Sequence, residues 1–335
     1  MTPRKNIVLV VGAGASHDVE PEMGTGKDLI QNISDRVTDR TALARGENGY
    51  LVNLLEKLNQ NEITRKKFVR LIDKYKSIGC SVDYFLNEVR EKHPEIIDDF
   101  GKIGTFSIAF EIFGYEGACL RNASFNKPSW LEELNKFIEQ YRLNTWSDRL
   151  VDLKIVTFNY DRLIEEFLFR KHGQAIKEFV DNSVVHVYNK IAPLGWQEED
   201  KAQFDNGFLE FGHRNDDIEG ILRYKEFVIL MYDKRNNSNP HLQKSKEFLS
   251  SADSILFLGY GYDKYNNKNL GLPTLNGKMI LANYYIPEWN DTWKKKYEEF
   301  KSNNEIWGTQ RDGIIFTTET CTNFIRHWLP KAAEL

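Results

Sequence analysis

Short apolar runs that are rich in β-branched residues recur along the chain and predict buried strands. The first run covers residues 6–11 (NIVLVV) and ends at Gly12. Further runs occupy residues 153–158, 183–188, 254–259, 278–284 and 313–316, with a weaker one at 225–231. Runs of this kind are typical of strands that are covered on both faces, as in a parallel sheet.

Apolar residues at helical spacing fill the intervals between these runs. The pattern predicts helices at 50–60, 63–76, 81–92, 104–113 and 129–143, and later at 161–172, 241–252, 289–302 and from Cys321 onward. We therefore expect an α/β fold, a Rossmann-like parallel sheet flanked by helices, with a large helical insertion after the first strand. Residues 1–30 and 150–335 would form the sheet domain, and residues 31–149 the helical subdomain.

The composition is that of a soluble globular protein and excludes several classes of site. The chain has 335 residues, 41% hydrophobic and 28% charged, with a net charge of -4, so direct nucleic-acid binding is not expected. Cys80, Cys119 and Cys321 are far apart, which excludes a four-cysteine zinc site and suits a reducing cytoplasm. No apolar run is long enough for a membrane span or a signal peptide. We expect a cytoplasmic protein without a membrane segment.

A glycine-rich turn follows the first predicted strand. In VVGAGAS, Gly12 and Gly14 would let the backbone approach a phosphate, which the following N–H groups could bind, and Ser16 adds a hydroxyl donor. Position 17 is His17, where the dinucleotide fingerprint has a third glycine. This motif alone is therefore weak support for a dehydrogenase.

A second glycine cluster, GTGK at residues 24–27, is similar to the end of a P-loop. A P-loop needs a glycine where this chain has Pro21, and a serine or threonine where it has Asp28. We therefore expect a turn that leads into a helix rather than an ATP-binding loop.

Polar residues at the ends of two predicted strands are the strongest candidates for chemistry. Asn159 and Asp161 follow the strand at 153–158, and in an open α/β sheet ligands bind at the carboxyl ends of the strands. Either residue could instead only cap the helix that follows. His186 lies in the apolar run at 183–188, where a histidine is either a hydrogen-bonded core residue or a general base. No two histidines have the spacing of a metal site, and we expect no metal.

Taken in order, these segments resemble the sirtuin-like family, and specifically its bacterial branch found in antiphage defence. The similarity covers most of the chain. It is carried by Gly12-Ala13-Gly14-Ala15-Ser16, Pro21 with Gly24-Thr25-Gly26, SVDYFL at 81–86, Thr157-Phe158-Asn159-Tyr160-Asp161, His186, and FLGYGYDKYNNKNLGL at 257–272.

The resemblance implies an NAD+ site whose contacts come from the glycine turn and from the ends of the later strands. Sirtuins break the bond between nicotinamide and ribose in NAD+. The resemblance implies that the glycine turn holds the pyrophosphate of NAD+ through Gly12, Ala13, Gly14 and Ser16. It implies further NAD+ contacts from Gly259, Tyr260 and Asn283.

The resemblance also implies three roles closer to the reaction. Asn159 would orient the attacking water and contact the ribose, Asp161 would bind the nicotinamide carboxamide, and His186 would be the general base. Elementary chemistry agrees, because nicotinamide is already a cationic leaving group, and the site has only to stabilise an oxocarbenium-like centre and position a nucleophile.

The chain departs from the family pattern in three places. Asn189 stands where a glycine is expected, although asparagine tolerates the left-handed backbone that such a turn requires. Tyr260 and Gly261 follow Gly259 where sirtuins often have Thr-Ser. The chain also cannot build the four-cysteine zinc module of deacylating sirtuins, which favours NAD+ hydrolysis over protein deacylation.

The sequence hypothesis is therefore an NAD+ glycohydrolase that depletes NAD+ in bacterial antiphage defence. The resemblance implies control by assembly, either as a homo-oligomer or with a partner such as a HerA-type hexameric ATPase or an Argonaute-type sensor. The alternative is a catalytically silent subunit that binds NAD+ or ADP-ribose in a larger defence complex. A dehydrogenase is disfavoured by His17 and by the T-x-N-Y-D element at 157–161.

Overall fold

The computed structural model describes residues 4–37, 49–76, 81–141, 151–197, 209–213, 239–275, 277–285, 290–307 and 313–334. Within these ranges, six parallel strands form one sheet in the order β3-β2-β1-β4-β5-β6. The strands are β1 (Lys5–Val11), β2 (Val151–Thr157), β3 (Val184–His186), β4 (Ser254–Leu258), β5 (Met279–Asn283) and β6 (Ile314–Thr317). This is the strand order of a Rossmann fold and confirms the predicted fold class. The run at 225–231 lies outside the described residues.

Strand β1 occupies the centre of the sheet, with β2 on one side and β4 on the other. Leu9 lies opposite Ile155 of β2 and Leu256 of β4. Residues 7–11 are at most 1% exposed. Because successive residues of a strand point to opposite faces, helices must cover the sheet on both sides.

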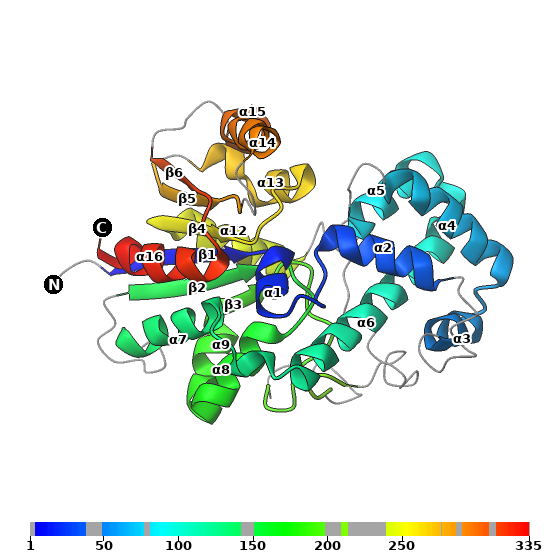
Figure 1. Cartoon of the computed structure of the whole chain (residues 1–335), viewed down its shortest axis with the longest axis horizontal. Coiled ribbons are helices and arrows are strands. Elements are labelled where there is room, and N and C mark those ends of the chain that lie inside the picture. The colour runs from blue at the N-terminus through cyan, green and yellow to red at the C-terminus, as the bar shows by residue number, and fades with distance from the viewer. Residues whose placement is uncertain are drawn as a thin grey trace.

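Helices connect the strands and also form a long segment between β1 and β2 (Figure 1). In that segment the helices are α1 (Ala13–Val19), α2 (Gly26–Arg36), α3 (Gly49–Lys57), α4 (Glu62–Lys76), α5 (Val82–Lys92), α6 (Ile97–Arg121) and α7 (Trp130–Gln140). After β2 they are α8 (Leu163–His172), α9 (Lys177–Ser183), α12 (Pro240–Ser251), α13 (Lys264–Leu270), α14 (Asp291–Ser302), α15 (Asn304–Trp307) and α16 (Cys321–Glu334). The predicted helix at 104–113 is the middle of the longer α6.

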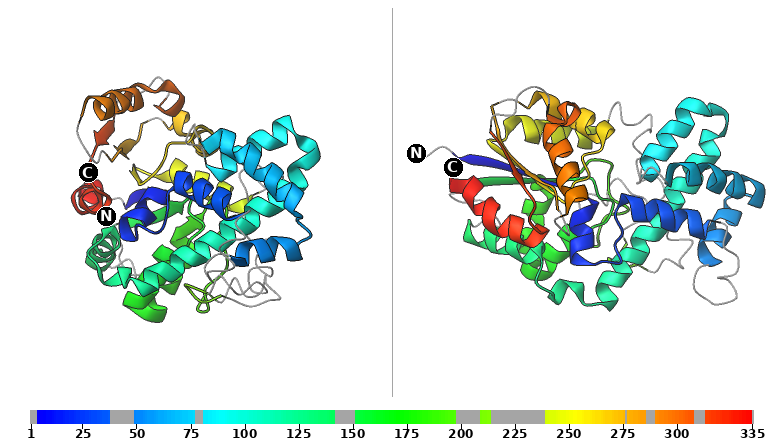
Figure 2. Two further views of the ribbon diagram at one scale, coloured as in Figure 1. Left: turned by 45° about the vertical axis from the view of Figure 1, so that its right-hand side comes forward. Right: turned by 45° about the horizontal axis from the view of Figure 1, so that its top comes forward.

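Helices α2 to α6 gather beyond the carboxyl edge of the sheet (Figures 1 and 2). Helix α7 returns to the sheet and packs beside α16 and α1. The Trp130 indole N–H of α7 donates to the carbonyl of Ala15 over 2.8 Å, and this tryptophan is fully buried. The predicted helical segment 31–149 therefore includes one helix that packs with the helices of the sheet.

A buried ion pair attaches α6 to the turn between β2 and α8. The Arg162 guanidinium donates to both carboxylate oxygens of Glu116, over 2.6 and 3.1 Å, and both side chains are 0% exposed. Arg162 also donates to the carbonyl of Leu209 over 2.6 Å. Through this pair the long helix is fixed at the edge of the sheet where ligands bind in Rossmann folds. No helix among the described residues is long and apolar enough to cross a membrane.

Candidate active site

The glycine turn after β1 packs directly on the turn after β4. The N–H of Gly14 donates to the carbonyl of Gly259 over 3.0 Å. A Cβ on Gly12 would lie 2.6 Å from that same carbonyl oxygen, and one on Gly259 would lie 2.1 Å from the nitrogen of Ala15. Gly259 also has φ +57, a left-handed conformation that glycine adopts readily. These glycines are therefore required for backbone contact between two turns, whatever ligand the turns hold.

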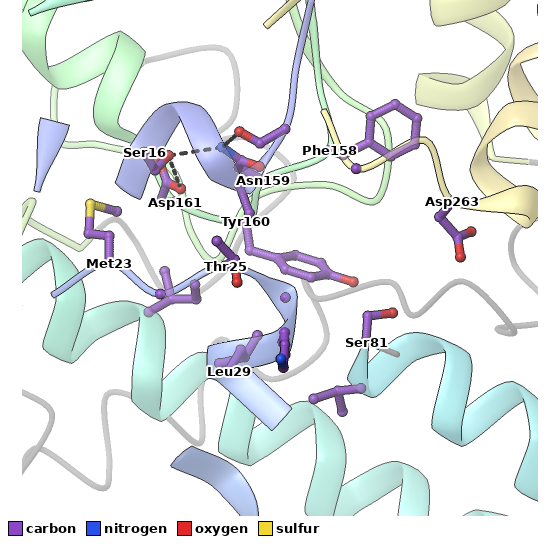
Figure 3. A pocket seen from close by; sticks show the side chains of 18 of the residues that line it. Ser16, Met23, Thr25, Leu29, Ser81, Phe158, Asn159, Tyr160, Asp161 and Asp263 are labelled. Carbon is purple, nitrogen blue, oxygen red and sulfur yellow. Dashed lines mark hydrogen bonds between the residues drawn. The ribbon is translucent and has the colours of Figure 1, made fainter. Parts of the chain in front are cut away.

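Three buried side chains connect α1 to the turn after β2 (Figure 3). The Asn159 amide donates to the Ser16 hydroxyl over 2.9 Å and to the carbonyl of Gly12 over 3.2 Å. The Ser16 hydroxyl donates in turn to an oxygen of Asp161 over 2.9 Å. All three side chains are at most 8% exposed. We call Ser16, Asn159 and Asp161 the polar triad.

The alternative that Asp161 only caps a helix is half correct. One of its carboxylate oxygens accepts from the backbone N–H of Leu163, at the start of α8, over 3.2 Å, while the other accepts from Ser16. Burial raises the pKa of Asp161 to about 6, because the Ser16 hydroxyl offsets only part of that effect and the nearby Glu116 carboxylate adds to it. A carboxylate with such a pKa changes its charge close to neutral pH.

The polar triad borders a cavity of about 370 Å³ at the carboxyl edge of the sheet. This volume lies within the usual range for small-molecule sites, roughly 300–1,000 Å³. The walls come from the segments that follow β1, β2, β3 and β4, from the first turns of α2 and α5, and from the second half of α6. Lining residues include Gly12, Ala13, Ser16, Met23, Thr25, Lys27, Ser81, Tyr115, Phe158, Asn159, Tyr160, Asp161, Tyr188, Tyr260, Asp263 and Asn266.

The second glycine cluster forms one wall of this cavity. As predicted, it is a turn that leads into a helix: Thr25 is the N-cap of α2, and Thr25 and Asp28 form a capping box. Residues 23–27 also line the cavity, which the comparison with a P-loop did not anticipate. The sequence contained an indication of this wall, because residues 23–27 follow the glycine turn of β1 closely along the chain.

His186 lies at the end of β3, but its ring does not line the cavity. It is 5% exposed, its Nδ1–H donates to the carbonyl of Asn159 over 2.8 Å, and its Nε2 meets a carboxylate oxygen of Glu165 at 2.8 Å. Burial raises the pKa of Glu165, but His186 and Lys190 outweigh this and lower it to about 2. Both ring nitrogens therefore make contacts within the protein, one with the backbone of Asn159 and the other with Glu165.

The residue that does reach the cavity from this part of the chain is Tyr188. Strand β3 ends at His186, two residues earlier than predicted, because a turn follows in which the N–H of Asn189 donates to the carbonyl of His186. Asn189 has φ +66, so it adopts the left-handed conformation that its position requires. The Tyr188 hydroxyl donates to the side-chain oxygen of Asn266 over 2.6 Å. The sequence pattern missed Tyr188 because strand alternation does not continue through a turn.

The structure brings together only part of the implied NAD+ contacts. Tyr260 lines the cavity, whereas Gly14 and Gly259 serve the packing of the two turns. Asn283 is 4% exposed and uses its amide locally: it accepts from the Thr317 hydroxyl over 3.0 Å and donates to the carbonyl of Glu319 over 3.1 Å. Asn283 therefore fixes the end of β5 to that of β6 rather than facing the cavity.

Within the described part of the chain, no group of three or more His, Cys, Asp or Glu side chains could hold a metal ion. No protein-family model matches this sequence, and a search of curated proteins found no match.

Proposed function

We propose that this chain binds NAD+ in the cavity and hydrolyses the bond between nicotinamide and ribose. The observation that carries the proposal is the buried polar triad, which stands beside the cavity at the carboxyl edge of a sheet with Rossmann strand order. A carboxylate, an amide and a hydroxyl are already aligned there before any ligand enters.

The reaction requires the protein mainly to stabilise a positive charge on the ribose and to position the attacking water. As water attacks C1′ of the ribose, the C1′–N bond breaks and its electron pair neutralises the pyridinium nitrogen of nicotinamide. The ribose carbon carries positive charge in between, and the Asp161 carboxylate would stabilise it. The side-chain oxygen of Asn159 makes no hydrogen bond within the described residues and could accept one from the water. Asp161 would take the proton that the water loses.

His186 enters this proposal as a positioning residue rather than as the general base. Its ring bonds the backbone of Asn159 and the carboxylate of Glu165, and neither nitrogen is left for a substrate. We expect this contact to fix the position of Asn159, and Asn159 in turn to position the attacking water.

The test is incubation of the purified chain with NAD+, with products separated by chromatography and identified by mass. We expect nicotinamide and ADP-ribose from the wild type, and at least about a hundredfold less from Asn159→Ala and Asp161→Asn, as for the loss of one preorganised group. Asn182→Ala is the matched control, because this exposed asparagine donates only within its own helix. NAD+ that neither binds nor reacts would overturn the proposal.

A second candidate function is a silent subunit that binds NAD+ or ADP-ribose. It is favoured by one observation: the β3 turn presents Tyr188 to the cavity, and no histidine is among the described residues that line it. Calorimetric binding of NAD+ without turnover would favour this reading, provided that turnover stays absent in the assembled complex. The defence role and its controlling partner, a second copy, a HerA-type ATPase or an Argonaute-type sensor, are part of the proposal through the resemblance alone.

A further inference from the structure

Asp263 is a second carboxylate at the cavity, and it stands apart from the polar triad. It follows the β4 turn and is the N-cap of α13: its Oδ1 accepts from the backbone N–H groups of Tyr265 and Asn266, over 2.9 and 3.1 Å. Its Oδ2 accepts no hydrogen bond from the described residues. Asp263 lines the cavity, and Figure 3 shows it on the side opposite Asp161.

The charges around the cavity are unusual for a site that would hold phosphates. Of the described residues that line it, the charged ones are Lys27, Asp161 and Asp263. Lys27 is exposed, whereas both carboxylates are at least partly buried. A ligand with an additional phosphate next to Asp263 would meet an uncompensated negative charge in a site partly shielded from water.

We infer that Asp263 accepts a hydrogen bond from a ribose hydroxyl at the end of the ligand away from the reaction, and so selects NAD+ and ADP-ribose against their 2′-phosphorylated forms. This inference rests on the proposed nucleotide site. If the nicotinamide ribose lies at the polar triad, the adenosine ribose lies toward the other side, where Asp263 and Asn266 line the wall. A carboxylate on a ribose 2′-hydroxyl is the general means by which NAD+ sites reject NADP+.

Asp263→Asn is the appropriate variant because it removes the negative charge and keeps the helix cap of α13. Asparagine is as good an N-cap as aspartate, so α13 keeps its first hydrogen bonds while the negative charge is lost. Asp291→Asn is the matched control: it removes an exposed carboxylate from the first turn of α14, and Asp291 does not line the cavity.

The probes are ADP-ribose and its 2′-phosphate, because neither is consumed by hydrolysis at the nicotinamide bond. Titration calorimetry of the full chain should show that the wild type prefers ADP-ribose by at least about tenfold, as expected for one charge-assisted hydrogen bond. In Asp263→Asn this preference should shrink by at least about fivefold, mainly through tighter binding of the 2′-phosphate, and in Asp291→Asn it should not change.

Equal wild-type affinities, or an unchanged ratio in Asp263→Asn, would overturn this inference while the proposed function stands. Binding of neither probe would overturn this inference, and the proposed function falls with it only if NAD+ is also neither bound nor hydrolysed. If the ratio changes as expected but NAD+ is not hydrolysed, the inference holds for the silent binding subunit.

Discussion

Asp161 carries the charge on which the proposed reaction depends. Its pKa is raised to about 6, mainly by burial, so the carboxylate loses its charge just below neutral pH. Only the ionised form can stabilise the ribosyl cation and accept a proton. We therefore expect kcat/KM for NAD+ to rise with pH and to level off above an apparent pKa near 6. Initial rates measured over mildly acid to mildly alkaline buffers at constant ionic strength would check this, and a profile that falls over that interval would contradict it.

The Ser16 hydroxyl should set the position of that profile. It donates to Asp161 and favours the ionised form, so its loss in Ser16→Ala should raise the pKa of Asp161 and move the midpoint to higher pH. The comparison variant is Ser34→Ala, which removes a buried hydroxyl that bonds Asp73 and does not line the cavity. A lower rate at Ser16→Ala with an unmoved midpoint would mean that the hydroxyl only positions the ligand.

His186→Ala should weaken the fold rather than only the reaction. The substitution leaves the buried Glu165 carboxylate without its main partner, and breaking such a pair costs about 3–5 kcal/mol. Urea unfolding at neutral pH would measure this loss. His327→Ala serves as the reference because His327 pairs with Glu319 on the surface, where an ion pair contributes about 0–1 kcal/mol. Full stability in His186→Ala together with complete loss of turnover would instead restore the general-base assignment.

At the scale of elements, the glycines show that a positive φ can be required for two reasons. Gly259 and Gly173 have nearly the same φ, +57 and +58, but a Cβ on Gly173 meets nothing within 4 Å. Gly173→Ala should therefore lower stability by about 1–3 kcal/mol, the cost of a side chain at φ +58 and ψ -142, a conformation that is almost confined to glycine. Gly259→Ala should cost clearly more, because its Cβ would overlap the backbone of Ala15. Thermal unfolding of both variants would separate the two costs, and equal losses would contradict the packing argument.

Strand positions could be predicted from the sequence because β1 and β4 are buried along most of their length and leave nearly uninterrupted apolar runs, and the other strands still carry several adjacent apolar residues. Asn159 and Asp161 could be placed at a carboxyl edge for the same reason. It could not be predicted that Tyr188 lines the cavity in place of His186, since this depends on the residue at which β3 ends. Asp263 also escaped notice, because a helix N-cap and a cavity carboxylate have the same appearance in a sequence.

At the scale of the whole molecule, the cavity depends on how α2 to α6 are held against the sheet. The sheet supplies the polar triad, while the helices supply Thr25, Ser81 and Tyr115 on the facing wall. The ion pair between Glu116 and Arg162 spans the two parts next to Asp161. Sequence reasoning could not find this pair, because its partners are 46 residues apart on elements whose packing no local pattern specifies. A ligand that touches both walls would bind only when that packing is in place.

Among helices α2 to α6, we expect Glu111 to make the packing sensitive to pH. This side chain of α6 is 1% exposed and pairs with Arg36 of α2 over 2.8 Å, yet burial raises its pKa to about 7 and Arg36 offsets only part of that rise. Since the folded pKa lies above the ordinary value of a glutamate carboxyl, Glu111 contributes stability at low pH that is lost as the pH rises through about 7. Amide exchange should therefore become faster in α2 and α6, relative to β1 and β4, as the pH increases, once the intrinsic exchange rates are corrected. Glu111→Gln cannot ionise and should remove the difference, whereas Glu298→Gln, an exposed change in α14, should leave it intact. If α2 and α6 exchange in constant proportion to the sheet, these helices and the sheet respond to pH as one unit, and the cavity between them does not open on its own.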